Sequence, residues 1–269
     1  MMSTAADILV IDDEPVVEDA VIKICALDNY SVEVAANVKS AIEKISKNYY
    51  PIIVCDIMMP DGDGFKVLDE LHSRNIDSSV IMTTGYSTVE NAVNSLYMGA
   101  IDFIPKPFTV DELLNSVFRA NRYQQIKNRQ KSFSLQITDR ELLYVNCPVR
   151  YLRLGYASWM FEERDGSVLI GVCDLFLKTI ETVKSIELSD HDEEISQGIS
   201  CLSITTTDER THKMLSPISG RIVEVNENIK MNPSLIEKDP YFEGWIYRVI
   251  PADIEYEKKH LIMCSSELL

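Results

Sequence analysis

The sequence of 269 residues lacks any apolar run long enough to cross a membrane, since a spanning helix needs about 20 predominantly apolar residues in succession. Its N-terminus also lacks the basic region and following apolar stretch that mark a secretory leader. Hydrophobic residues still make up 46% of the chain, enough to build globular cores. We therefore expect a globular, cytoplasmic protein of two ordinary domains, with no membrane partner.

Basic residues are scarce as well. The chain carries 26 Lys and Arg against 42 Asp and Glu, which gives a formal net charge of −16. Acidic residues outnumber basic ones in both halves of the chain. Residues 1–123 hold 9 basic and 19 acidic side chains, and the remainder holds 17 basic and 23 acidic ones. Binding to a phosphate backbone requires a concentrated basic surface. The composition therefore predicts no nucleic-acid partner.

The six cysteines form no Cys-x-x-Cys pair and have no histidine nearby at metal-ligand spacing. They are Cys25, Cys55, Cys147, Cys173, Cys201 and Cys264. Such scatter favours buried, reduced thiols over a metal site or a disulfide framework.

A continuous apolar run at residues 52–55 is the most informative stretch that the sequence does contain. The run ends in Asp56 and is followed by a turn that holds Pro60, Gly62 and Gly64. This pattern predicts a strand buried on both faces. Asp56 then lies at the carboxyl end of the strand, where open α/β sheets bind their ligands. Taken alone, such an aspartate is more often a turn former or a helix cap.

Three further apolar runs end in polar groups. The run at 8–11 leads into Asp12, Asp13 and Glu14; the run at 80–83 leads into Thr84; and the run at 101–104 leads into Lys106. If the strands are parallel, all these groups meet at one edge of the sheet. Clustered carboxylates repel one another unless a cation lies among them, and hard oxygen ligands suit Mg²⁺. An aspartate beside that ion can act as a nucleophile toward phosphorus.

Helical periodicity follows each predicted strand. It occurs at residues 15–24, 39–47, 65–71, 87–96 and 109–122, and an alternating segment at 31–35 supplies the remaining strand. Five βα repeats predict an α/β domain with a five-stranded parallel sheet in the flavodoxin-like order 2-1-3-4-5.

Residues 5–123 resemble the receiver domain of two-component response regulators. The likeness rests on the strand-end residues, on the turn from Met59 to Gly64 and on Lys106-Pro107-Phe108. It implies Asp56 as the phosphoacceptor and Phe103 as an aromatic switch. The other implied roles are Mg²⁺ binding by Asp12, Asp13, Asp56 and the backbone carbonyl of Met58, and phosphoryl contacts by Thr84 and Lys106.

The resemblance also implies partners and activity. The phosphoryl group would come from a histidine kinase or a phosphotransfer protein, and the receiver could form a homodimer. The domain would not be an enzyme beyond self-phosphorylation from phospho-His and slow autodephosphorylation. Phosphorylation would shift the face made by the fourth helix, the fifth strand and the fifth helix.

Residues 124–150 are expected to form a linker. The fifth helix could continue through 123–131, but this segment is polar and lacks an apolar repeat after Ile126, which favours a solvated linker over a coiled coil. Residues 140–144 are compatible with one helical turn.

Residues 151–255 change in character to short alternating strands with turns at Gly166, Gly198 and Gly220. The pattern predicts a mostly-β domain with a short helix around 174–179, a core anchor at Trp245 and a tail over 256–269. Segments 159–172, 216–226 and 232–245 resemble the H protein of the glycine cleavage system, a hybrid barrel related to lipoyl domains.

One departure from that family bears on function. The lipoylated lysine of the family lies eight residues before the proline of a Pro-x-Ser-Gly turn, and here that position is Glu209. A carboxylate cannot form the amide that attaches lipoic acid, and Lys213 lies four residues further on. We therefore expect no lipoyl attachment and no lipoate.

Three hypotheses follow. The first is a phosphorylation-dependent switch whose H-protein-like domain binds an unidentified downstream protein. The second is a lipoyl carrier of a glycine-cleavage-type system gated by phosphorylation, which Glu209 disfavours. The third is an adaptor whose second domain only dimerises.

Overall fold

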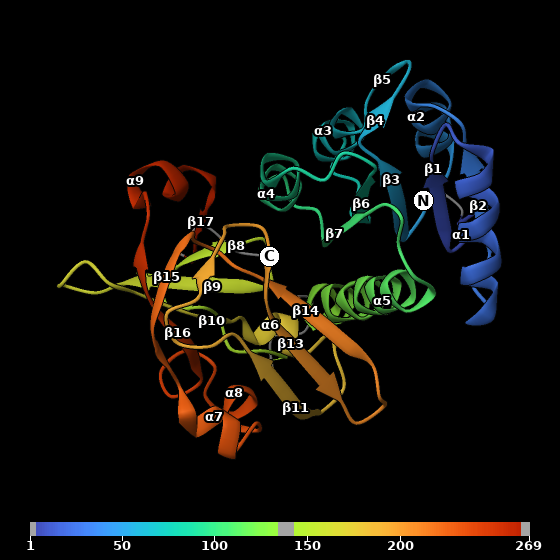
Figure 1. Ribbon diagram of the computed structural model, residues 1–269. Helices are drawn as coiled ribbons and strands as arrows, with labels where there is room; N and C mark the ends of the chain where they lie inside the picture. Colours follow the sequence, from blue (N-terminus) through green and yellow to red (C-terminus); the bar gives the residue numbers. More distant parts are fainter. Residues whose placement is uncertain (1–3, 134–142, 265–269) are drawn as a thin grey trace. The chain divides into compact units, whose positions relative to one another are not determined.

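The computed structural model describes residues 4–133 and 143–264 (Figure 1). The chain forms two compact units. The first comprises residues 1–88 and 98–128, and the second comprises 89–97 and 129–269. No helix in the described ranges is both long and apolar enough to cross a membrane.

The first unit is built on a five-stranded parallel sheet with the order β2-β1-β3-β6-β7. Its strands are β1 (Ile8–Ile11), β2 (Val32–Ala35), β3 (Ile52–Asp56), β6 (Ser79–Thr84) and β7 (Asp102–Pro105). The two-residue strands β4 (Met58–Met59) and β5 (Gly62–Asp63) pair only with each other. The predicted fourth and fifth strands are therefore β6 and β7, and the flavodoxin-like order is confirmed.

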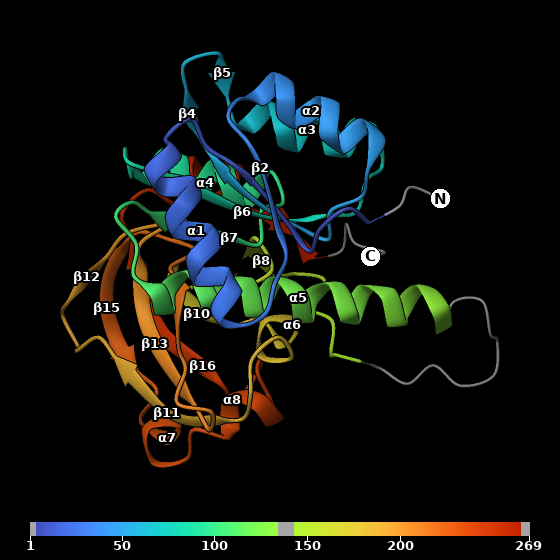
Figure 2. The same cartoon turned by 90° about the vertical axis from the view of Figure 1, so that its right-hand side faces the viewer.

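The helices follow the strands as the periodicity predicted. They are α1 (Pro15–Leu27), α2 (Val38–Lys47), α3 (Phe65–Ser73), α4 (Val89–Tyr97) and α5 (Val110–Phe133). Local signals set their starts, since Pro15 opens α1 and the Asn37 side chain accepts a hydrogen bond from the backbone N–H of Ser40 at 2.8 Å. Helices α2 and α3 lie side by side on one face of the sheet (Figure 2) and bury their apolar residues against it.

Helix α5 runs on to Phe133, well past the apolar repeat. Polar anchors explain the first part of the extension, because the buried Gln124 amide donates hydrogen bonds of 3.0 Å to the Asp77 carbonyl and to Ser79 Oγ. Lys127 forms an ion pair with Asp77. The helical turn expected over 140–144 lies largely outside the described residues.

The second unit contains mostly antiparallel strands, as predicted. One sheet has the order β12-β15-β16-β10-β9-β8-β17, and a second has the order β11-β13-β14. The strands are β8 (Leu152–Leu154), β9 (Ser158–Glu162), β10 (Val168–Val172), β11 (Val183–Leu188), β12 (Glu194–Ile195), β13 (Ser200–Thr206), β14 (Thr211–Leu215), β15 (Gly220–Val225), β16 (Trp245–Pro251) and β17 (Ile262–Met263).

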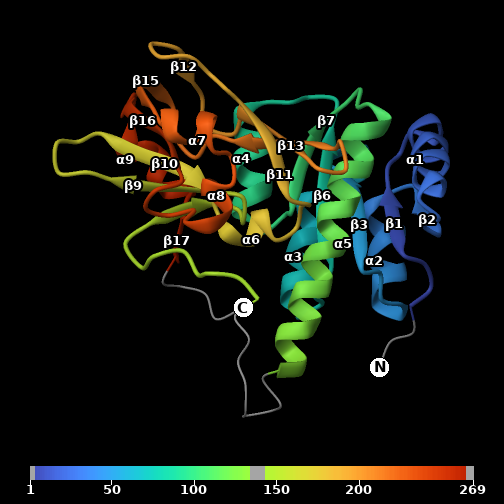
Figure 3. The same cartoon turned by 90° about the horizontal axis from the view of Figure 1, so that it is seen from below.

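Short helices complete the second unit. Helix α6 (Asp174–Leu177) lies where a short helix was predicted, and α7 (Glu227–Met231) and α8 (Leu235–Lys238) lie side by side (Figure 3). Helix α9 (Ile254–Glu257) and a 3₁₀ turn (Lys258–His260) lead into β17, which pairs with β8. The sheet therefore extends into residues that were expected to form a tail.

The aromatic core of the second unit is centred on Trp159. Its indole is fully buried and donates hydrogen bonds to the carbonyls of Val172 at 3.0 Å and Pro240 at 3.1 Å. A Cβ at position 171 would lie 2.5 Å from the ring, so only glycine allows this approach. Trp245, predicted as the anchor, is only partly buried at the edge of this cluster. The prediction placed the core anchor at the wrong tryptophan, because a turn pattern in the sequence does not show how deeply a neighbouring tryptophan is buried.

Candidate functional site

The candidate site lies at the carboxyl edge of the parallel sheet. Asp12 directly follows β1, Asp56 is the last residue of β3, Thr84 ends β6 and Lys106 directly follows β7. All these strands run in the same direction, with Asp56 in register beside Thr83 and Thr84 beside Pro105. The parallel topology thus brings together residues that are nearly a hundred positions apart.

Three carboxylates meet at this edge. One oxygen from each of Asp12, Asp13 and Asp56 lies within 4.8 Å of the others. Asp12 and Asp56 are only 2% and 4% exposed, whereas Asp13 is partly accessible. Such a set of hard oxygen donors, partly open to solvent, matches the preference of Mg²⁺ for a few carboxylates together with water.

Lys106 supplies the positive charge of the site. Its Nζ lies 2.7 Å from Asp12 Oδ2 and 2.7 Å from Asp56 Oδ2, and 3.5 Å from Glu14 Oε1. Burial by itself lowers the pKa of Lys106, but the hydrogen bonds and charges of the two aspartates outweigh it and raise the pKa. The ammonium group is therefore held charged where a phosphoryl oxygen would need it.

Asp12 experiences the opposite balance. Burial raises its pKa above the ordinary value of 3.8, although Lys106 and the backbone N–H of Glu14, 3.1 Å from Oδ1, oppose the shift. Burial is thus the largest influence on this carboxyl group, and it disfavours the charged form.

The loop after β3 orients Asp56. The backbone N–H of Met58 donates to Asp56 Oδ1 at 3.2 Å, while Oδ2 faces Lys106. Gly64 closes this loop with a 2.8 Å hydrogen bond from its N–H to the Ile57 carbonyl. A Cβ at position 64 would lie 2.0 Å from the Asp56 carbonyl oxygen, so the turn requires glycine there.

The remaining predicted residues occupy distinct positions. Thr84 is fully buried, and its Oγ1 accepts a hydrogen bond of 3.1 Å from the backbone N–H of Tyr86. Its carbonyl accepts a hydrogen bond of 2.7 Å from the backbone N–H of Lys106, which ties the ends of β6 and β7 together. Phe103 lies on β7 beside Met82 and packs half-buried against the apolar core.

Two contributors received no role from the sequence. Glu14 was noted only as part of an acidic run, yet its carboxylate contacts Lys106. Gly64 was noted only as a turn residue. The spacing of the turn residues could have predicted a structural role for Gly64. Nothing in the sequence distinguishes Glu14 from an ordinary exposed acidic residue.

Comparison with known proteins bears on both units. Residues 8–118 match the response regulator receiver domain family, and residues 150–267 match the glycine cleavage H-protein family. The transcriptional regulatory protein DltR of Streptococcus agalactiae is 31% identical over 173 residues, which cover 64% of this chain and 70% of DltR. The chain belongs to the response regulator family.

Other relatives of this response regulator match only part of it. The regulatory protein AtoC of Escherichia coli is 36% identical over 126 residues, 47% of this chain and 27% of AtoC. The C4-dicarboxylate transport transcriptional regulatory protein DctD of Pseudomonas aeruginosa is 32% identical over 137 residues, 51% of this chain and 30% of DctD. The chain thus spans less than a third of the length of either relative.

Solved structures resemble each part of the response regulator. A receiver domain protein from Methanospirillum hungatei is 30% identical with a TM-score of 0.43, covering 47% of this chain and 99% of its own. A glycine cleavage system H protein from Mycobacterium marinum is 27% identical with a TM-score of 0.40, covering 44% of this chain and 94% of its own.

The H-protein-like part of the response regulator presents Glu209 at the tip of the β13–β14 hairpin. Glu209 adopts a φ of 63°, its backbone N–H donates to the Thr206 carbonyl at 3.0 Å, and its carboxylate lies 2.5 Å from Lys184 Nζ. Lys213 lies within β14, in register with Ser203, and not at the tip.

Proposed function

We propose that this response regulator is a phosphorylation-dependent signalling switch in which Asp56 accepts a phosphoryl group from the phospho-His of a histidine kinase or a phosphotransfer protein. The supporting observation is the position of the Asp56 carboxylate, 2.7 Å from Lys106 Nζ and grouped with Asp12 and Asp13 at the sheet edge. The family relationship supplies the donor class.

The transfer follows from the groups present. A carboxylate oxygen of Asp56 attacks phosphorus, the phosphorus–nitrogen bond of phospho-His breaks, and the imidazole leaves as the acyl phosphate forms. Lys106 neutralises charge on the transferring phosphoryl oxygens. Thr84, whose carbonyl accepts a hydrogen bond from the Lys106 N–H, would donate its hydroxyl to a phosphoryl oxygen once Asp56 carries the group.

The donor set also fits a divalent cation. Asp12, Asp13 and Asp56 are the carboxylates that would hold Mg²⁺. The family resemblance adds the backbone carbonyl of Met58 as a further ligand. When bound, the ion would offset the repulsion between the carboxylates and the incoming phosphoryl group.

The decisive experiment replaces the nucleophile and keeps its size. We expect Asp56→Asn to abolish labelling by acetyl phosphate with Mg²⁺, because the amide cannot attack phosphorus. Asp63→Asn is the matched control, since Asp63 is exposed and its Oδ1 only accepts a hydrogen bond from the Phe65 N–H, which asparagine can also do. Full labelling of Asp56→Asn, or equal loss in both variants, would refute the assignment.

We further propose that the H-protein-like domain is the output and binds a downstream protein without carrying lipoate. Support comes from Glu209, whose carboxylate occupies the hairpin tip and pairs with Lys184. A carrier function would require an amine at that place.

A further inference from the structure

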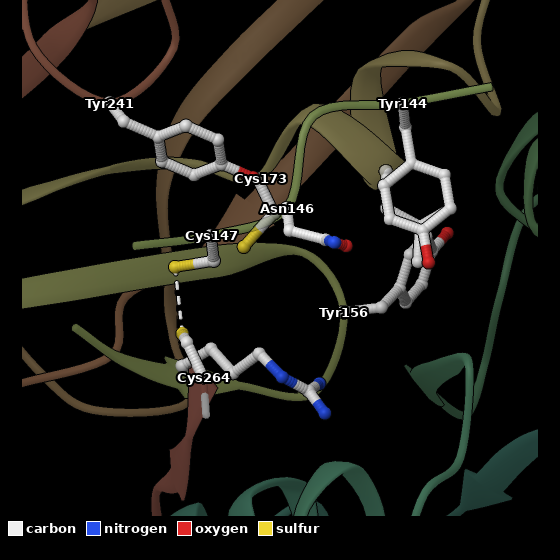
Figure 4. Close-up of a pocket in the computed structure, with 9 residues that line it drawn as sticks. Tyr144, Asn146, Cys147, Tyr156, Cys173, Tyr241 and Cys264 are labelled. Carbon is white, nitrogen blue, oxygen red and sulfur yellow. Dashed lines mark hydrogen bonds between the residues drawn. The ribbon is translucent and has the colours of Figure 1, made fainter. Parts of the chain in front are cut away.

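Three of the six cysteines gather in the second unit, although they are far apart in the sequence. Cys147 lies in the loop before β8, Cys173 directly precedes α6, and Cys264 directly follows β17. Together they line a small cavity of about 40 Å³, whose wall also includes Tyr241 and Arg153 (Figure 4).

Cys147 is the central thiol of this group. Its Sγ lies 2.7 Å from Cys264 Sγ, the contact drawn as a dashed line in Figure 4, and it is hydrogen-bonded to the thiol of Cys173 as well. All three are reduced thiols. Cys147 and Cys264 are partly accessible, whereas Cys173 is buried.

Backbone contacts fix the segments that carry the thiols. The Cys264 N–H donates to the Tyr151 carbonyl at 3.1 Å, which continues the pairing of β17 with β8. Tyr241 Oη donates to the Val145 carbonyl and accepts from the Asp174 N–H, both at 3.0 Å. Val145, two residues before Cys147, and Asp174, next to Cys173, are thus bonded to the same tyrosine. A disulfide needs its sulfur atoms at about 2.05 Å, and the Cys147 and Cys264 sulfur atoms already lie 2.7 Å apart.

We propose that Cys147 and Cys264 are an oxidant-responsive pair that forms a reversible disulfide with hydrogen peroxide, and that Cys173 is an alternative partner for Cys147. The cavity supports the choice of oxidant. A water molecule needs roughly 10–15 Å³ of such volume, so about 40 Å³ admits a molecule as small as hydrogen peroxide.

The chemistry balances with peroxide alone. One thiol of the pair loses its proton and its sulfur attacks a peroxide oxygen; the O–O bond breaks, a sulfenic acid forms, and the departing hydroxide takes up a proton to become water. The second sulfur then attacks the sulfenic sulfur, the S–O bond breaks, and a second water leaves with the proton of that thiol. Two thiols and one hydrogen peroxide give one disulfide and two waters.

The surroundings of Cys147 determine how fast its thiol is oxidised. Hydrogen bonds with the Cys173 and Cys264 thiols, together with burial, raise the pKa of Cys147. Since the thiolate is the nucleophile, oxidation is slow at neutral pH and accelerates as the pH rises.

Peptide mapping of the full chain tests the proposal directly. Trypsin places each thiol of the cluster in its own peptide, namely residues 141–150, 165–178 and 260–269. After peroxide treatment and alkylation under denaturing conditions, we expect the first and third peptides to appear linked, with a mass two hydrogens below their sum. Dithiothreitol should release them. The measurement needs no variant, so misfolding cannot produce a false negative.

Variants then assign the partners. Cys147→Ser should abolish the linked species, and Cys264→Ser should redirect Cys147 to the 165–178 peptide. Cys201→Ser is the matched control, because Cys201 is buried in the same unit and its thiol donates to the Met214 carbonyl at 3.7 Å. Alkylation of both Cys147 and Cys264 in the peroxide-treated wild type would overturn the proposal, and so would a linkage that excludes either of them.

Discussion

Lys106 is the counter-ion of two buried carboxylates, so its removal should lower the free energy of unfolding. Only 10% of its side chain is exposed, and Asp12 and Asp56 each approach its Nζ to 2.7 Å. Removing one partner of a buried ion pair leaves an uncompensated charge, which is far more costly than the loss of a surface pair. The proposed phosphorylation site is thus also a point on which the stability of the first unit depends.

We expect Lys106→Met to destabilise the metal-free protein by about 3 kcal/mol. Mg²⁺ should recover part of this loss, because a bound cation can replace the missing ammonium charge among the carboxylates. Urea unfolding with a chelator and with Mg²⁺ measures both effects. Lys66→Met, on the exposed surface of α3, should change the free energy of unfolding by no more than about 0.5 kcal/mol. Equal stability of the two variants would contradict this account.

Glu33 makes the stability of the first unit depend on pH. Its carboxylate accepts a hydrogen bond from Tyr50 Oη and another from Lys44 Nζ at 3.1 Å, and these contacts lower its pKa below the ordinary 4.5. A depressed pKa contributes stability above the unfolded-state pKa, and that stability is lost as the pH falls through the folded-state value. We expect Glu33→Gln to melt below the wild type at neutral pH, with the difference in Tm shrinking below about pH 4.5. A constant difference between pH 3 and 7, measured by a melting series, would contradict it.

At the scale of elements, the β3–α3 loop is shaped by the close approach of Gly64 to Asp56. An added Cβ would lie 2.0 Å from a backbone oxygen, which cannot move aside as a flexible side chain could. We expect Gly64→Ala to cost at least about 2 kcal/mol and to slow acetyl phosphate labelling, because the loop that orients Asp56 must shift. Gly85→Ala is the control for stability, since nothing lies within 4 Å of its Cβ position. Equal unfolding midpoints for the two variants would exclude a steric role for Gly64.

The strand ends were predictable because parallel strands bring their carboxyl termini to one edge, so local apolar runs were enough to group Asp12, Asp56, Thr84 and Lys106. Helix α5 was not predictable in its full length. Its extension depends on Gln124 and on contacts with Asp77, which periodicity does not detect because it registers only apolar burial.

Contacts between distant segments explain the other misses. Cys147 and Cys264 are 117 residues apart and meet only because β17 pairs with β8. The fully buried Trp159 depends on a glycine in the neighbouring strand β10. Neither arrangement leaves a local pattern. The sequence predicted reduced thiols, as the structure has them, but not that Cys147 and Cys264 lie together, and it favoured the other tryptophan.

At the scale of the whole molecule, the H-protein-like domain matches the glycine cleavage H-protein family over residues 150–267, and we propose that it carries no lipoyl group. We expect the full chain, produced in lipoate-fed cells, to show its unmodified mass, because Glu209 offers no amine at the tip and Lys213 lies within β14. Glu209→Lys is the informative variant, since it restores an amine at a tip whose φ is already 63°. A lipoyl unit on wild-type Lys213 would overturn the signalling output in favour of a carrier.

The location of Trp159 and Trp245 allows the second unit to be followed by its intrinsic fluorescence. Both tryptophans of the chain, Trp159 and Trp245, belong to the second unit, so the receiver contributes no indole emission. Fluorescence excited selectively at tryptophan therefore reports on the H-protein-like domain alone, without labels. Beryllofluoride, a phosphoryl mimic, would bind beside Asp56 in the unit that lacks tryptophan. A change in emission on its addition would then be a direct optical readout of a signal passing from one unit to the other.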